Sequence, residues 1–189
     1  AAVAGDTLHV AEGTYYPDEG GGWSNNDRLA TFRLQSGVAL LGGFPVGGGD
    51  SAERNPAANR TMLSGDIDQD DGADFANNSG NSFTVVAAEE VGSSAILDGF
   101  VITAGNADGT TLIEARGGGM FCSRDANPVI RNCTFLSNYG DVGGGLYICN
   151  NSFPEVTSCR FVGNQSGYGG GLFICIGSSP TLVNCAFEG

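Results

Sequence analysis

Five of the six cysteines of this chain recur at a fixed interval of 26 residues. Two sets share the interval: Cys133, Cys159 and Cys185 in one, and Cys149 and Cys175 in the other. The surrounding sequence repeats with them, so residues 117–189 consist of tandem units, the last of which is cut short. A period of about 20 to 50 residues is typical of solenoids, propellers and arrays, in which each unit buries its apolar face only against its neighbours. The repeat therefore limits the architecture before any strand is assigned.

Each unit contains two short runs of β-forming residues. In the middle unit the runs are 146–149 and 156–161, and turn-prone Asn150, Asn151 and Pro154 lie between them. Neither run shows the period of about 3.6 residues that a helix requires. The pattern predicts one coil of a parallel β-helix, stacked on the next at about 4.8 Å. Equivalent positions of successive coils should then form columns.

Three apolar columns are predicted to form the core. They are Met120, Leu146 and Leu172; Ile130, Val156 and Leu182; and Phe135, Phe161 and Phe187. Positions i and i+2 of a strand share a face, so the cysteine two residues before each phenylalanine should be buried as well, as an interior ladder of thiols. Cys149 and Cys175 lie nearer a corner and are the better disulfide candidates. Metal binding by cysteine is disfavoured because the only histidine, His9, is distant in sequence and should point outward.

The same parity predicts an outward aromatic stripe of Phe121, Tyr147 and Phe173, one position after the Leu/Met column. We consider it a candidate binding surface, although a loop such as 108–116 would equally cover it. Asparagine tolerates the left-handed backbone conformation of tight corners. Asparagine positions that recur around the cysteine and the phenylalanine are therefore predicted to form corner ladders, with Asn132 and Asn184 at corners.

The units have the form Gly-Gly-Gly-Leu-aromatic, followed by Pro-x-apolar-x-Asn-Cys-x-Phe-x-x-Asn. They resemble the right-handed parallel β-helix repeats of large bacterial surface and secreted proteins. They share the Gly-Gly-x-Ile/Leu and Phe-x-x-Asn tetrapeptides of polymorphic outer-membrane-protein repeats. Upstream segments 5–15, 37–44, 63–68 and 97–102 are similar to the early coils of such proteins. The resemblance implies an all-β, right-handed parallel β-helix of the pectate-lyase-like type, a scaffold that carries lyases, hydrolases, adhesins and inert stalks alike.

We expect one domain over residues 1–189, with irregular, loop-rich coils at 1–116 and regular 26-residue coils at 117–189. The net charge is −13, from 21 acidic and 8 basic residues, all of them arginine. Such a charge disfavours nucleic acid and anionic lipid as partners. No stretch has the apolar length of a transmembrane helix, so membrane insertion is not expected.

From the two ends of the sequence we expect a piece of a longer protein. Ala1 is not an initiator, and the chain stops in mid-coil at Gly189. Uncapped coils present unpaired strand edges, which favour end-to-end self-association and, where the contact does not close on itself, a filament.

An acidic cluster precedes the regular repeats. Asp66, Asp68, Asp70, Asp71 and Asp74 place five carboxylates in nine residues. Ca²⁺ takes about 6 to 8 oxygen ligands and suits such a segment. We predict a structural calcium site at Asp66, Asp68, Asp70 and Asp74, the alternative being a solvated acidic loop. In either case the cluster would order a loop rather than perform chemistry.

Segments 20–26, 47–59 and 108–116 are predicted to be loops that project from the early coils. Loops on a rigid scaffold often carry binding residues. Trp23, the only tryptophan, lies near Tyr15 and Tyr16. These aromatic residues are candidates for stacking on a sugar, or for a packed cover over the first coil.

Catalysis would need paired acids. Glycoside hydrolysis uses two carboxylates about 5 to 9.5 Å apart, and the acids that follow Gly117 share no column: Asp125, Asp141, Glu155 and Glu188. We therefore predict a non-catalytic β-helix, extracellular or on a cell surface, with a structural or adhesive role. Its expected partners are further copies of itself, other surface proteins or a polysaccharide. The alternative is a carbohydrate-active enzyme or a glycan-binding module whose site lies in the early loops.

Overall fold

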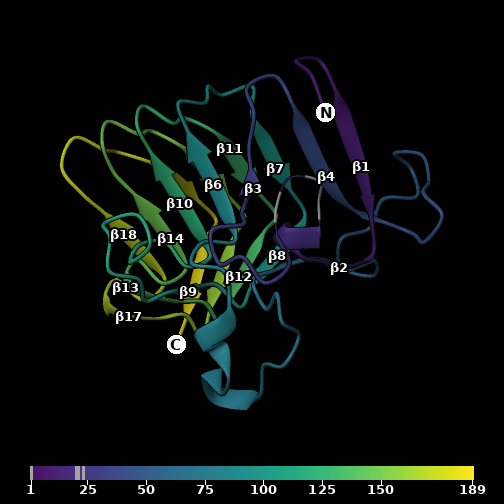
Figure 1. Cartoon of the computed structure of the whole chain (residues 1–189). Helices are drawn as coiled ribbons and strands as arrows, with labels where there is room; N and C mark the ends of the chain where they lie inside the picture. The colour runs from purple at the N-terminus through teal and green to yellow at the C-terminus, as the bar shows by residue number, and fades with distance from the viewer. Residues whose placement is uncertain (1, 20–21, 23) are drawn as a thin grey trace.

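The computed structural model describes residues 2–19, 22 and 24–189, which wind through stacked coils of parallel strands. Figure 1 shows the coils in succession from the purple N-terminal coil to the yellow C-terminal one. Sheet A contains β1 (Thr7–Ala11), β4 (Ala39–Phe44), β7 (Ile96–Asp98), β11 (Val129–Arg131), β15 (Glu155–Thr157) and β19 (Thr181–Val183). Sheet B contains β2 (Gly13–Tyr15), β5 (Thr61–Ser64), β8 (Phe100–Thr103), β12 (Thr134–Leu136), β16 (Arg160–Val162) and β20 (Ala186–Glu188).

Two further sheets complete the coils. Sheet C contains β3 (Phe32–Arg33), β6 (Val86–Glu89), β10 (Met120–Ser123), β14 (Leu146–Ile148) and β18 (Leu172–Ile174). The small sheet D contains β9 (Asn106–Ala107), β13 (Tyr139–Val142) and β17 (Gln165–Tyr168). Short 3-10 turns occupy Pro17–Glu19 (η1), Ala73–Phe75 (η2) and Asn78–Gly80 (η3). The predicted parallel β-helix is confirmed. The described residues contain no helix with the length and hydropathy needed to cross a bilayer.

Strand register confirms the predicted core columns. Met120 pairs with Leu146 and Leu146 with Leu172, and the isoleucine and phenylalanine columns align in the same way. The rings of Phe135 and Phe161 stack with centroids 4.8 Å apart, and both are essentially inaccessible to solvent. The prediction that Phe187 and Leu182 are buried is wrong, because these residues of the last coil are 54 % and 39 % exposed. Phe187 stacks on Phe161, but no further described coil covers its other face.

The corners follow the predicted asparagine positions. Asn132, Ser158 and Asn184 have φ angles of 54°, 54° and 53°, in the left-handed region. Inside the coil, Asn138 is fully buried. Its side-chain nitrogen donates to the carbonyl oxygen of Ile102 at 3.0 Å and to Oδ1 of Asn164 at 3.0 Å. The ladder therefore satisfies polar groups where the backbone turns, which stabilises buried corners.

The cysteines divide as the sequence predicts. Cys149 and Cys175 form a disulfide that joins neighbouring coils, with Cα atoms 5.0 Å apart. Cys133 and Cys159 are buried free thiols, and Cys185 is a partly buried one. The Cys133 thiol donates to the carbonyl oxygen of Arg131 at 3.2 Å. These three thiols form the interior ladder.

Candidate functional site

The outer face of sheet B is lined by side chains that alternate with the buried phenylalanine column. Val101, Thr134 and Arg160 align in one outward column, and Thr103, Leu136 and Val162 align in the next. These positions flank Ile102, Phe135 and Phe161, which are buried. Because successive side chains of a strand point to opposite faces, the outer face is a flat, regular surface of hydroxyl, aliphatic and arginine side chains.

A groove of about 700 Å³ runs along this face beside the connection between β4 and β5, residues 45–60. Three of the chain's arginines line it: Arg54, Arg60 and Arg160. Asn55, Pro56 and Ala57 form part of its wall. Arg160 is paired with Glu188 at 2.9 Å, and both side chains are at least half exposed. Arg60 makes no ion pair within the described chain and is exposed. We call it the basic groove because the charged side chains that line it are all arginines. Arg54 and Arg160 are ion-paired with Asp98 and Glu188, so Arg60 is the arginine of the groove that has no carboxylate partner in the described chain.

The buried carboxylate of Asp98 fastens the connection to the coil beneath it. Asp98 Oδ1 accepts hydrogen bonds from Arg54 at 2.7 Å and from the side chain of Asn132 at 2.9 Å. Its Oδ2 accepts one from Arg131 at 2.8 Å. Burial alone would raise the pKa of Asp98, but the hydrogen bonds from Arg54, Asn132 and Arg131 hold that pKa below its usual range. These hydrogen bonds fix the position of Arg54 in the wall of the basic groove.

A second groove, of about 570 Å³, adjoins the first on the same face. Thr103, Ser137 and Gly163 line it. Each of them lies one or two positions further along the chain than a residue that lines the first groove. Its outer wall is the acidic connection after β5, with Asp66 and Asp71. The two grooves form a trough across sheet B, basic at one side and acidic at the other.

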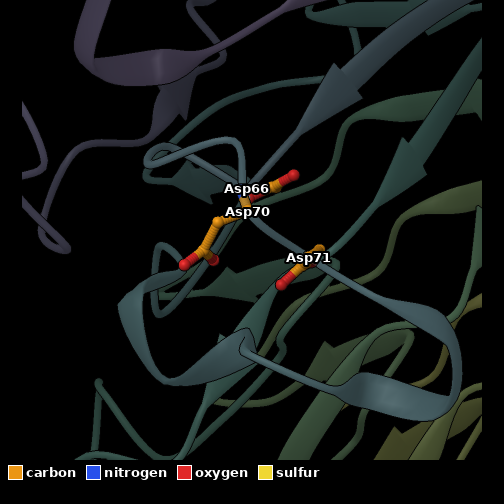
Figure 2. Close-up of side chains that lie close together, drawn as sticks. All are labelled: Asp66, Asp70 and Asp71. Atoms are coloured by element: carbon orange, nitrogen blue, oxygen red, sulfur yellow. The ribbon is translucent and has the colours of Figure 1, made fainter.

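Figure 2 shows Asp66, Asp70 and Asp71 gathered in the connection that follows β5. Their carboxylates each offer an oxygen within 4.8 Å of the others. Burial raises the pKa of Asp71, and the negative charges of its neighbours, Asp66 foremost, add to this despite a hydrogen bond from Asn81. One oxygen each of Asp68 and Asp71 is buried without a hydrogen-bond partner in the described chain.

The structure brings together only part of the predicted ligand set. Asp66 and Asp70 lie in the cluster, but Asp68 and Asp74 do not join it. The Asp68 carboxylate packs against Gly80, where an added Cβ would collide with it. Asp74 is exposed in η2 with a φ of 56°, and it lines the same groove as Asp66 and Asp71 without joining their carboxylate cluster. The predicted set omits Asp71, which the structure places in the cluster. Its signal was the second carboxylate of the Asp-Asp-Gly turn.

The predicted aromatic stripe points outward from sheet C but is covered. Phe121 is 6 % exposed and Tyr147 only 2 %, while Phe173 is half-buried. The guanidinium of Arg116 lies 5.3 Å from the Tyr147 ring centre and donates to its hydroxyl at 2.9 Å. The stripe is therefore not an open binding surface, because the connection before β10 closes over it.

The aromatic cluster predicted near the first coil is only partly within the described chain. Trp23 lies outside the described residues. Tyr15 donates its hydroxyl to the carbonyl oxygen of Ala11 at 3.2 Å, while Tyr16 lines the acidic groove. His9 is exposed and stacks on Phe44, with ring centres 4.1 Å apart. Among these described residues, Tyr16 is the one that faces the trough on sheet B.

The stacked parallel strands define a solenoid scaffold, and the trough lies on its sheet B face. Residues 65–189 match the family model described as right-handed β-helix region. The match covers more than half of the chain, which therefore belongs to the right-handed β-helix family. No curated protein and no solved structure matches the chain.

Proposed function

We propose that the chain is a non-catalytic β-helix of a bacterial type of cell-surface or secreted protein, with a structural and adhesive role. Its ligand is an acidic polysaccharide held along the outer face of sheet B. The observation that carries the proposal is the basic groove, which gathers Arg54, Arg60 and Arg160 on a chain of net charge −13. An extended polyanion matches both the repeated columns along the face and this local charge.

Two further observations support the proposal. The Cys149–Cys175 disulfide is typical of proteins in oxidising, extracellular compartments. The basic groove is lined by no carboxylate among the described residues, so binding there does not bring a sugar chain to an acid pair.

The binding test compares polygalacturonate with neutral dextran by affinity electrophoresis. Replacing Arg60 and Arg160 together by glutamine is expected to weaken polygalacturonate binding roughly tenfold, since two charge-assisted contacts are lost. Arg124→Gln is the matched control, because Arg124 is similarly exposed and paired with Glu89 away from the groove. Equal loss in the control, or binding unchanged in the double variant, would refute the proposed ligand. Light scattering of the same samples reports self-association, which remains a second proposed partner mode.

The alternative, a carbohydrate-active enzyme of the pectate-lyase-like type, is favoured by the acidic side of the trough. Asp71 has a raised pKa, as a general acid requires, and it lies in a cluster with Asp66 in the second groove. Release of reducing ends or unsaturated products from polygalacturonate, lost in Asp71→Asn, would establish the enzyme and overturn the non-catalytic proposal.

We also propose that the cluster of Asp66, Asp70 and Asp71 binds Ca²⁺ and orders the connection after β5. Ca²⁺ is expected to raise the melting temperature, because a ligand present at a hundredfold excess over its Kd adds about 2.7 kcal/mol to the folded state. Differential scanning calorimetry in EGTA and in millimolar Ca²⁺ measures the shift. Asp71→Asn should abolish it, whereas Asp125→Asn, outside the cluster, should not. A melting temperature that is the same with and without Ca²⁺ excludes the site.

A further inference from the structure

A cavity of about 340 Å³ lies over sheet C, between the segment before β3 and the connection before β10. Its walls are the apolar side chains of Leu29, Phe83 and Ile113, of which Leu29 and Ile113 are more than half exposed. Phe121 and Ala87 form only its floor, because each is 6 % exposed. Small-molecule sites have volumes of about 300 to 1,000 Å³. The cavity is therefore large enough for a small ligand with an apolar body.

The arginines around the cavity are paired, but one carboxylate serves two of them. Arg28 is paired with Asp108 at 2.6 Å. Glu89 lies within ion-pair distance of both Arg33, at 3.1 Å, and Arg124, at 3.2 Å. This group of three side chains therefore keeps one unit of positive charge. Arg33 lines the cavity and is 57 % exposed, so its guanidinium has donors left for a ligand.

Glu114 is the remaining charged residue of the lining, and it makes no ion pair within the described chain. A compact turn holds it in place: the Gly109 amide donates to the Glu114 carbonyl oxygen at 3.2 Å, and the Glu114 amide donates to Oγ1 of Thr111 at 3.3 Å. The Glu114 side chain packs over Gly109 beside the Phe83 ring. A Cβ at Gly109 would lie 2.8 Å from Glu114 Oε2 and 3.0 Å from Phe83 Cε1. The cavity therefore has an unpaired negative charge at its Phe83 end.

The two unbalanced charges lie at opposite ends of the cavity. Arg33 pairs with Ala87 in strand register, and its guanidinium donates to Glu89, which is two residues further from Phe83. Phe83 and Ala87 are four residues apart, which is up to about 13 Å of extended chain. With charge-assisted contacts of about 3 Å at each end, a ligand would need about 7 Å between its own charges. The complementary ligand has an ammonium group and a carboxylate joined by an apolar spacer.

We infer that the cavity over sheet C binds an ω-amino acid. The ammonium group of the ligand pairs with Glu114, and its carboxylate pairs with Arg33. The methylene spacer lies against Leu29, Phe83 and Ile113, where its burial adds to two ion pairs that are each weak alone. The site is on a different sheet from the trough, so the inference is independent of the proposed polysaccharide.

The test compares 6-aminohexanoate with hexylamine and hexanoate, each of which lacks one of the two charges. Saturation-transfer NMR and calorimetric titration of the full chain should show 6-aminohexanoate binding at millimolar concentration. Both analogues should bind about fivefold more weakly, because each loses one exposed ion pair. Glu114→Gln should weaken 6-aminohexanoate binding about fivefold without weakening that of hexanoate. Arg33→Gln should have the same effect on 6-aminohexanoate without weakening the binding of hexylamine.

Glu155→Gln is the matched control, because Glu155 is exposed on sheet A and does not line the cavity. It should bind all three probes as the unaltered chain does. Equal affinities for the three probes would overturn the inference, since they would show that the cavity selects only an apolar body. No binding of 6-aminohexanoate to the unaltered chain, or undiminished binding to Glu114→Gln, would overturn it as well. If Arg33→Gln fails to fold, Glu114→Gln and the two analogues decide the question.

Discussion

Replacing Phe161 by alanine is expected to lower the free energy of unfolding by about 3 to 5 kcal/mol. The Phe161 ring is 1 % exposed and lies between Phe135 and Phe187, with centroid separations of 4.8 and 4.7 Å. The coils above and below are held in register by strand pairing, so they cannot close the cavity that the missing ring leaves. Urea denaturation followed by circular dichroism measures the loss.

Phe187→Ala is the matched control for this prediction. Phe187 occupies the same column, but its side chain is 54 % exposed. Folding removes less of the apolar surface of Phe187 from water than of Phe161. The loss of unfolding free energy in Phe187→Ala should therefore be less than half of that in Phe161→Ala. Equal losses in the two variants would show that the column does not have the gradient of burial described above.

Replacing Asp98 by alanine is expected to lower the free energy of unfolding by about 3 kcal/mol, at the lower end of the range for breaking a buried ion pair. Asp98 is 3 % exposed, and its loss leaves Arg54 without its carboxylate partner. Arg131 is 45 % exposed and recovers water, which moderates the cost. Glu188→Ala removes the exposed partner of Arg160 and should cost less than about 1 kcal/mol.

The same carboxylate predicts a dependence of stability on pH. The pKa of Asp98 is lowered in the folded chain. Its contribution is therefore fully present above the ordinary aspartate pKa of about 3.9, and is lost as the pH falls through the lower folded value. The melting temperature should decrease as the pH falls below about 4. In Asp98→Asn, the melting temperature should depend less on pH in this range. Parallel profiles for the two proteins would refute the role of Asp98.

The regular coils could be predicted from sequence because a constant period places every unit in the same register. Once Phe161 is assigned to the core, the phenylalanines one period away must stack on it. The corner position of Asn132 and the disulfide between Cys149 and Cys175 follow from the same repeat. The exposure of Phe187 does not, because burial depends on a neighbouring coil and not on the unit itself.

The candidate site was harder to predict because it is built by the connections that do not repeat. Parity gave the outward direction of Tyr147 correctly, but its burial depends on Arg116, which arrives from an irregular segment. The basic groove brings Arg54 and Arg60 close to Arg160, which lies about a hundred residues later in the sequence. The three arginines do not occupy equivalent positions of successive coils, so the repeat does not predict that they lie together. In the acidic connection, the backbone is left-handed at Gln69 and Asp74, and these turns affect which carboxylates lie close together. The spacing of the aspartates in the sequence does not predict such turns.

The Cys149–Cys175 bond has a mechanical consequence for a stacked solenoid. Tension on the two ends of a stacked solenoid peels the coils off one at a time, because each is held only by its neighbours. The bond encloses 26 residues between adjacent coils, which corresponds to roughly 90 Å of extended chain. That length cannot be released while the bond is intact. An oxidised chain under load therefore extends less than a reduced one and keeps two coils folded together as a single unit.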